Sequence, residues 1–110
     1  MSGASDGVVD GLETGEVMRT GYTDLQGDEF TNAGSVVDAH GGDDTVFGGY
    51  GADTIDGGSG DDWLFGGEGD DVLSGNDGAD TLWGDTGNDT LSGNDGDDKV
   101  IGGGGDDLVI

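Results

Sequence analysis

The sequence contains no cysteine and no proline, and Arg19 and Lys99 are its only lysine or arginine residues. Without cysteine the chain can form neither disulfides nor thiolate metal sites, and this absence fits either redox compartment. Two basic residues against 26 acidic ones give a formal net charge of −24. That charge argues against binding to nucleic acids or anionic membranes and makes multivalent cations the natural partners.

Apolar residues are also scarce. The hydrophobic fraction is 30% and the aromatic fraction 6%, whereas 28 of the 110 residues are glycine. No apolar run is long enough for a transmembrane helix or for the core of an N-terminal secretory signal. This composition is typical of disordered chains unless a regular repeat organises the residues.

A nine-residue repeat runs without insertion from residue 48 to residue 110. Its seven units are GGYGADTID, GGSGDDWLF, GGEGDDVLS, GNDGADTLW, GDTGNDTLS, GNDGDDKVI and GGGGDDLVI. A degenerate unit, AHGGDDTVF, precedes them at residues 39–47 in the same register. Position four is always glycine and position eight is always aliphatic, namely Val46, Ile55, Leu64, Leu73, Leu82, Leu91, Val100 and Val109.

Each unit combines a glycine-rich turn with a short extended segment whose position eight points inward, between outward positions seven and nine. Position two is Gly, Asn or Asp in every full repeat, which fits a left-handed backbone. A strand this short needs neighbours, so successive units must coil, with two units per turn, into two parallel sheets. The sequence therefore predicts an all-β solenoid over residues 39–110.

Position six is always aspartate, and two units per turn place these aspartates in two columns of stacked loops. One column holds Asp44, Asp62, Asp80 and Asp98, and the other holds Asp53, Asp71, Asp89 and Asp107. Carboxylates stacked about 4.8 Å apart repel each other unless a divalent cation lies between them. Carboxylate and turn carbonyl oxygens form a flexible all-oxygen site, which suits Ca²⁺ better than Mg²⁺ or Zn²⁺.

The units GGSGDDWLF and GGEGDDVLS resemble the GGxGxDxUx nonapeptide of the repeats-in-toxin (RTX) family. The resemblance covers residues 39–110 and implies a right-handed parallel β-roll with each Ca²⁺ between loops of adjacent turns. The implied ligands are the position-six aspartates and the backbone carbonyls of the turns around Gly48, Gly51, Gly57, Gly60, Gly66, Gly69, Gly75, Gly78, Gly84, Gly87, Gly93 and Gly96. Three gaps in each column predict about six internal ions.

Most members of this family are secreted, so the resemblance also implies a bacterial extracellular protein. The chain shows no export signal at either end, so the sequence does not indicate the route. Our first interpretation is a calcium-dependent extracellular structural or assembly module. The alternative is a repeat segment of a larger type I-secreted toxin, protease, lipase or adhesin, in which it aids secretion and folding.

Catalytic residues are not evident. His40 is the only histidine, so a catalytic triad or a histidine-based metal site cannot be assembled, and we interpret His40 as a turn residue at the entrance of the roll. Paired acids such as Asp61-Asp62 recur along the repeat, whereas an enzyme needs one distinctive site. The sequence therefore predicts a protein that is not an enzyme.

One outward face is rich in aromatic residues. Position nine of alternate units predicts a ladder of Phe47, Phe65, Trp83 and Ile101, with Trp63 at position seven. Such a ladder either stabilises neighbouring strands or forms a docking surface. Homo-assembly through this face, or through the open C-terminal edge of the last turn, is the corresponding hypothesis.

Residues 1–38 lack the glycine pattern of the repeat. We interpret them as an irregular N-terminal cap on the first turn, with a disordered lead-in as the alternative. The acidic segment at residues 24–29 is a candidate for one further ion.

Overall fold

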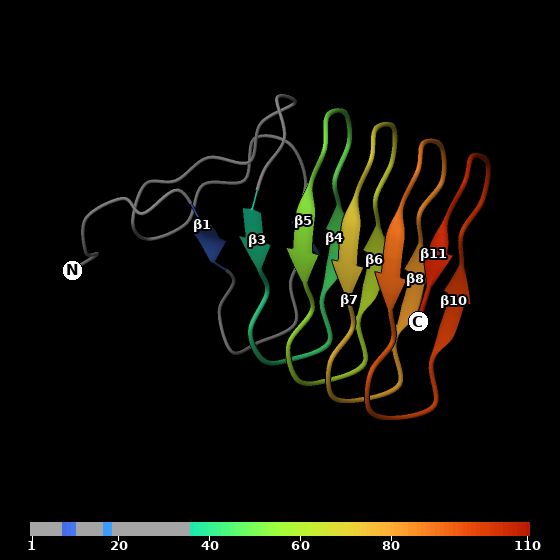
Figure 1. Ribbon diagram of the computed structural model, residues 1–110. Coiled ribbons are helices and arrows are strands. Elements are labelled where there is room, and N and C mark those ends of the chain that lie inside the picture. Colours follow the sequence, from blue (N-terminus) through green and yellow to red (C-terminus); the bar gives the residue numbers. More distant parts are fainter. Residues whose placement is uncertain (1–7, 11–16, 19–35) are drawn as a thin grey trace.

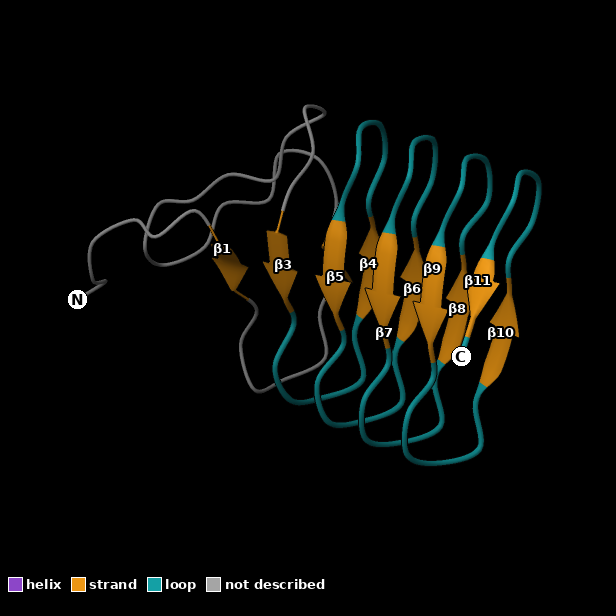
Figure 2. Ribbon diagram, in the orientation of Figure 1, coloured by secondary structure: helices purple, strands orange, loops and turns teal. Residues whose placement is uncertain are grey.

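The computed structural model describes residues 8–10, 17–18 and 36–110, and these residues form short parallel strands without any helix (Figures 1 and 2). Consequently, no helix in the described part is long and apolar enough to cross a membrane. The strands are β1 (Val8–Asp10), β2 (Val17–Met18), β3 (Val36–Asp38), β4 (Thr45–Phe47), β5 (Thr54–Asp56), β6 (Trp63–Phe65), β7 (Val72–Ser74), β8 (Thr81–Trp83), β9 (Thr90–Ser92), β10 (Lys99–Ile101) and β11 (Leu108–Val109).

The strands alternate between two sheets that lie one behind the other (Figure 1). The six-stranded sheet has the order β1-β3-β5-β7-β9-β11, and the five-stranded sheet has the order β10-β8-β6-β4-β2. Within the repeat, each strand pairs in parallel with the strand two units later, as Val46 does with Leu64 and Ile55 with Leu73. Two units therefore make one turn, and the predicted parallel solenoid is confirmed.

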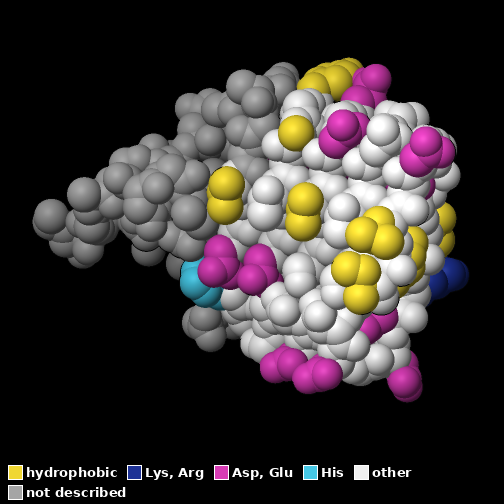
Figure 3. Space-filling view, viewed as in Figure 1, with side chains coloured by type: hydrophobic (Ala, Val, Ile, Leu, Met, Phe, Trp, Pro, Cys, Tyr) yellow, Lys and Arg dark blue, Asp and Glu magenta, His cyan; other side chains and the backbone are white. Residues whose placement is uncertain are grey.

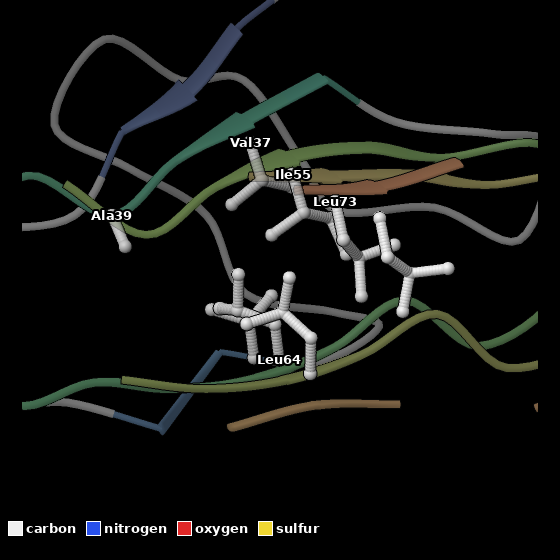
Figure 4. Packing of buried hydrophobic residues seen from close by; sticks show 8 residues of the cluster. Val37, Ala39, Ile55, Leu64 and Leu73 are labelled. Atoms are coloured by element: carbon white, nitrogen blue, oxygen red, sulfur yellow. The ribbon is translucent and has the colours of Figure 1, made fainter. Parts of the chain in front are cut away.

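The core is a double row of aliphatic side chains that the two sheets point toward each other (Figure 4). Its fully buried members are Val37, Ala39, Val46, Ile55, Leu64, Leu73, Leu82 and Leu91. Each large aliphatic side chain buried in this way stabilises the fold by roughly 1.5–3 kcal/mol. The last two residues at position eight depart from this pattern, because no further turn covers them: Val100 is partly buried and Val109 is 52% exposed.

Three strands from residues 1–38 extend the sheets N-terminally, so strand pairing continues beyond the predicted boundary between residues 38 and 39. Val8 pairs with Val36 and Val17 pairs with Thr45, a separation of 28 residues instead of the 18 found in the repeat. The chain between β2 and β3 is thus longer than a repeat loop. The candidate ion site at residues 24–29 lies outside the described residues.

Candidate metal centre

The position-six aspartates lie in the loops directly before the strands of the repeat. There their side chains turn inward, beside the aliphatic core. Six of the eight predicted metal ligands are fully buried, and Asp98 and Asp107, in the last turn, are partly buried. The buried ones are Asp44, Asp53, Asp62, Asp71, Asp80 and Asp89.

Hydrogen bonds connect these aspartates along each column. The backbone N–H of Asp62 donates to Oδ1 of Asp80 at 2.7 Å, and that of Asp71 donates to Oδ1 of Asp89 at 2.8 Å. The same bond, always between residues 18 apart, recurs in both columns up to Asp98 and Asp107. The structure therefore brings the predicted ligands together in the two columns that the repeat implies.

The second carboxylate oxygen has no such donor. Oδ2 of Asp62, Asp71, Asp80 and Asp89 is buried and accepts no hydrogen bond. Burial of an ionised oxygen without a partner costs free energy. A bound cation or a proton would remove this cost.

The pKa values of these carboxyl groups reflect the same environment. Burial raises the pKa of Asp62 and of Asp71 to about 7, against an opposing backbone hydrogen bond, and the neighbouring carboxylates of each column raise it further. Burial likewise raises the pKa of Asp80 to about 6 and shifts the pKa of Asp89 upward. Without a cation the columns thus resist full ionisation near neutral pH.

Glycine at position one makes room for the orphaned oxygen. A Cβ atom on Gly66 would lie 2.5 Å from Oδ2 of Asp71, and one on Gly75 would lie 2.5 Å from Oδ2 of Asp80. Only a residue without a side chain leaves the carboxylate in this place.

Glycine at position four lets one loop lie directly on the next. Gly78 has a φ of 112°, and a Cβ atom on it would overlap the carbonyl oxygen of Gly60, which lies 18 residues earlier. The turns therefore stack main chain against main chain, and at position one a carbonyl oxygen lies near the aspartate: a Cβ atom on Gly84 would meet Oδ2 of Asp89 at 2.5 Å and the carbonyl oxygen of Gly102 at 2.6 Å. The ligand atoms available between two turns are all oxygens. Oxygen ligands in a flexible geometry suit a hard cation such as Ca²⁺.

Comparison with protein families also indicates a calcium-binding repeat. The family model described as RTX calcium-binding nonapeptide repeat (4 copies) matches residues 38–73 and again residues 74–109. The chain belongs to the RTX calcium-binding repeat family. No curated protein and no solved structure matches it.

Side chains alone do not complete a site in this RTX roll. No group of three or more histidine, aspartate or glutamate side chains that could hold a metal occurs among the described residues.

A second ladder, which sequence reasoning missed, runs along position five of the RTX units. Oδ1 of Asp43 accepts the backbone N–H of Asp61 at 2.8 Å, and Oδ1 of Asp61 accepts that of Ala79 at 2.8 Å. Here the later turn donates to the earlier one, opposite to the direction at position six. The signal in the sequence is that position five is Asp or Asn in six of the eight units.

Position two takes the left-handed conformation that the sequence predicts. His40, Asn76, Asp85 and Asn94 have φ values of 65–69°. His40 lies in the loop between β3 and β4 and not at the entrance of the roll, because three strands precede it, and its Nδ1 lies 3.7 Å from Oδ1 of Asp38. It lies at a polar depression of about 410 Å³ whose lining includes Asp56.

The predicted aromatic ladder forms on the outer face of the five-stranded sheet. The rings of Phe47 and Phe65 stack with centroids 4.9 Å apart and planes 7° apart, and those of Phe65 and Trp83 stack at 4.4 Å and 2°. Ile101 pairs with Trp83 in the strand register and continues the row. Trp63 meets Trp83 edge to face, with centroids 5.7 Å apart.

Proposed function

We propose that this chain is an extracellular structural module that folds into its roll when it binds calcium. The observation that carries the proposal is the buried, unpartnered Oδ2 of Asp62, Asp71, Asp80 and Asp89, stacked turn upon turn. A column of buried carboxylates without counter-charge opposes folding, and ions that neutralise it favour folding.

In this proposal about six ions lie in the gaps between position-six aspartates 18 residues apart, three in each column. The aspartates from Asp44 to Asp107 and the carbonyl groups around the position-one and position-four glycines would hold them. The bound ions supply positive charge to the columns and bridge adjacent turns.

Extracellular calcium fits such sites. Modules of this kind bind Ca²⁺ with dissociation constants of about 10⁻⁴–10⁻³ M, so the chain would stay unfolded inside a cell and fold outside it. Calcium-dependent folding would also serve a larger type I-secreted protein, because it delays folding until after export. Self-association is the second part of the proposal, favoured by the exposed aromatic side chains of the five-stranded sheet.

A calcium titration followed by circular dichroism and light scattering tests this function. The chelated chain should lack the sheet signal, and millimolar Ca²⁺ should restore it, whereas Mg²⁺ at the same concentration should not. A full sheet signal in the presence of a strong chelator contradicts the proposal.

A further inference from the structure

The five-stranded sheet has a surface without acidic residues over its four repeat strands. The outward side chains of β4, β6, β8 and β10 are Thr45, Phe47, Trp63, Phe65, Thr81, Trp83, Lys99 and Ile101, which we call the aromatic face. The face carries one positive charge in a chain whose net charge is −24. The six-stranded sheet differs, because Asp38 and Asp56 lie on its outer side and acidic side chains gather beside the single histidine (Figure 3).

The way the rings stack indicates which ligands fit this face. Phe47, Phe65 and Trp83 stack with nearly parallel planes, so they cover each other's flat surfaces and turn their edges outward. Aromatic rings bury a large apolar area and make favourable edge contacts with other rings, so this face fits a partner with apolar and aromatic side chains. Trp63, which is 53% exposed, is the most prominent apolar group on this face, and tryptophan is the usual anchor of protein interfaces.

We infer that the aromatic face joins two copies of this chain face to face, about a twofold axis parallel to the strands. This inference rests on the proposed function, because the face exists only in the folded roll. The two rolls then run in opposite directions, and each turn of one copy meets a different turn of the other.

The strand register fixes the contacts of this pairing. Phe65 meets Trp83 of the second copy, and Phe47 meets Ile101, so the apolar residues at position nine form one continuous seam. At position seven the large Trp63 meets the small Thr81 of the second copy.

Lys99 decides between this pairing and one in which the rolls run in the same direction. In the proposed pairing Lys99 meets Thr45, two residues from the exposed Asp43 of the second copy. With the rolls in the same direction, Lys99 would instead lie over Ile101. A charged group gains from a nearby opposite charge and loses when an apolar residue covers it, so the antiparallel arrangement is preferred.

The size of the face sets the strength of the contact. Four strands about 4.8 Å apart, each with three residues at about 3.3 Å, outline a footprint of about 200 Å². Stable interfaces bury about 800 Å² per partner, so the pair should form only at high protein concentration. The acidic loops at its rim repel each other, so calcium and added salt should strengthen the association.

Cross-linking tests the pairing cleanly because the native chain has no cysteine. The double variant Phe47→Cys/Ile101→Cys, which keeps Lys99, should give covalent dimers when treated with a short bismaleimide in calcium. Each single variant should give few, since neither residue faces its own counterpart. Within one chain the two positions lie three turns apart, about 14 Å, beyond the reach of a short linker.

Circular dichroism of the same samples separates the two proposals. A normal calcium-induced sheet signal without covalent dimers, or with equal cross-linking of the single variants, overturns the pairing and leaves calcium folding intact. Loss of the sheet response in the unmodified chain overturns the proposed function and the pairing with it.

Sedimentation equilibrium with a matched pair of variants gives a second test. Thr81→Trp should weaken association about tenfold or more, because its ring collides with Trp63 of the second copy. Thr90→Trp, at the equivalent position of the six-stranded sheet, should leave association unchanged. Equal effects of the two variants, or association that weakens with added sodium chloride, contradict the pairing.

Discussion

Replacing Gly66 by alanine tests how closely the loops hold their carboxylates. The new Cβ atom would lie 2.5 Å from Oδ2 of Asp71 and 2.9 Å from the carbonyl oxygen of Gly84, both closer than real contacts allow. The buried Asp71 carboxylate would have to leave its place between the turns. Gly104 provides the matched control, since a Cβ atom there meets nothing within 4 Å and the residue has no positive φ.

The magnitude follows from the two proposed ion sites that would share Asp71. An ion with a dissociation constant of about 10⁻⁴ M, at a hundredfold higher free concentration, stabilises the folded state by about 2.7 kcal/mol. Losing two such ions costs about 5 kcal/mol, and overpacking of the loop adds about 1–3 kcal/mol. This total matches the whole stability of many small domains, about 5–15 kcal/mol. Gly104→Ala should instead stabilise the protein by about 0.4–1 kcal/mol, because alanine restricts the unfolded chain.

Calcium titration by circular dichroism, with isothermal titration calorimetry to count ions, distinguishes the variants. Gly104→Ala should fold at the calcium concentration of the native chain or slightly below it. Gly66→Ala should need much more calcium and bind two ions fewer. If Gly66→Ala folds at the native calcium concentration and binds the native number of ions, the carboxylate does not occupy the place described for it.

Three further predictions concern the column and the core. Asp62→Asn should lower the number of bound calcium ions by two, whereas Asp61→Asn, at position five, should leave it unchanged because the amide oxygen still accepts a hydrogen bond; calorimetry distinguishes these outcomes. Calcium binding to the folded roll should weaken as the pH drops through 7, because burial raises the pKa of Asp62 in the roll to about 7 and protons then compete with the ion. The same raised pKa means that protonation of Asp62 stabilises the calcium-free roll. This contribution is complete below the ordinary pKa of 3.8 and is lost as the pH rises through 7. Titrations across this range should show that acid weakens calcium binding and, with chelator present, stabilises the roll. Leu64→Ala should destabilise the calcium-loaded protein by about 2–5 kcal/mol in urea, whereas Val109→Ala, at the same repeat position but 52% exposed, should cost much less.

The repeat was predictable because its period leaves few arrangements open. An aspartate at position six and an aliphatic residue at position eight, such as Asp62 and Leu64, recur every nine residues and fix both the loop columns and the core. The N-terminal strands were less visible, since their loops lack the glycine pattern. The triplet Val-Val-Asp, which occurs at 8–10 and again at 36–38, was the available signal.

The position-five hydrogen bonds could not be predicted in the same way. Whether Asp61 accepts an N–H from the turn before or after it depends on how two loops lie on each other, which residue spacing does not specify. The same applies to the orphaned Oδ2 of Asp71, because its place depends on how its own loop, which begins at Gly66, packs on the loop that begins at Gly84. Spacing predicted the aspartate columns, and three-dimensional packing shows which carboxylate oxygen is buried without a hydrogen bond.

The two hydrogen-bond ladders run in opposite directions along the axis, so where position five is Asp or Asn each turn both donates to and accepts from its neighbour. A force that lifts the first loop must break the bond from the Asp61 N–H to Asp43, and it must also withdraw the Asp44 N–H from Asp62. Two turns joined in this way can separate only if both bonds break together. Where position five is alanine, as at Ala79, adjacent turns lack the second bond, so these are the places at which the roll should open first.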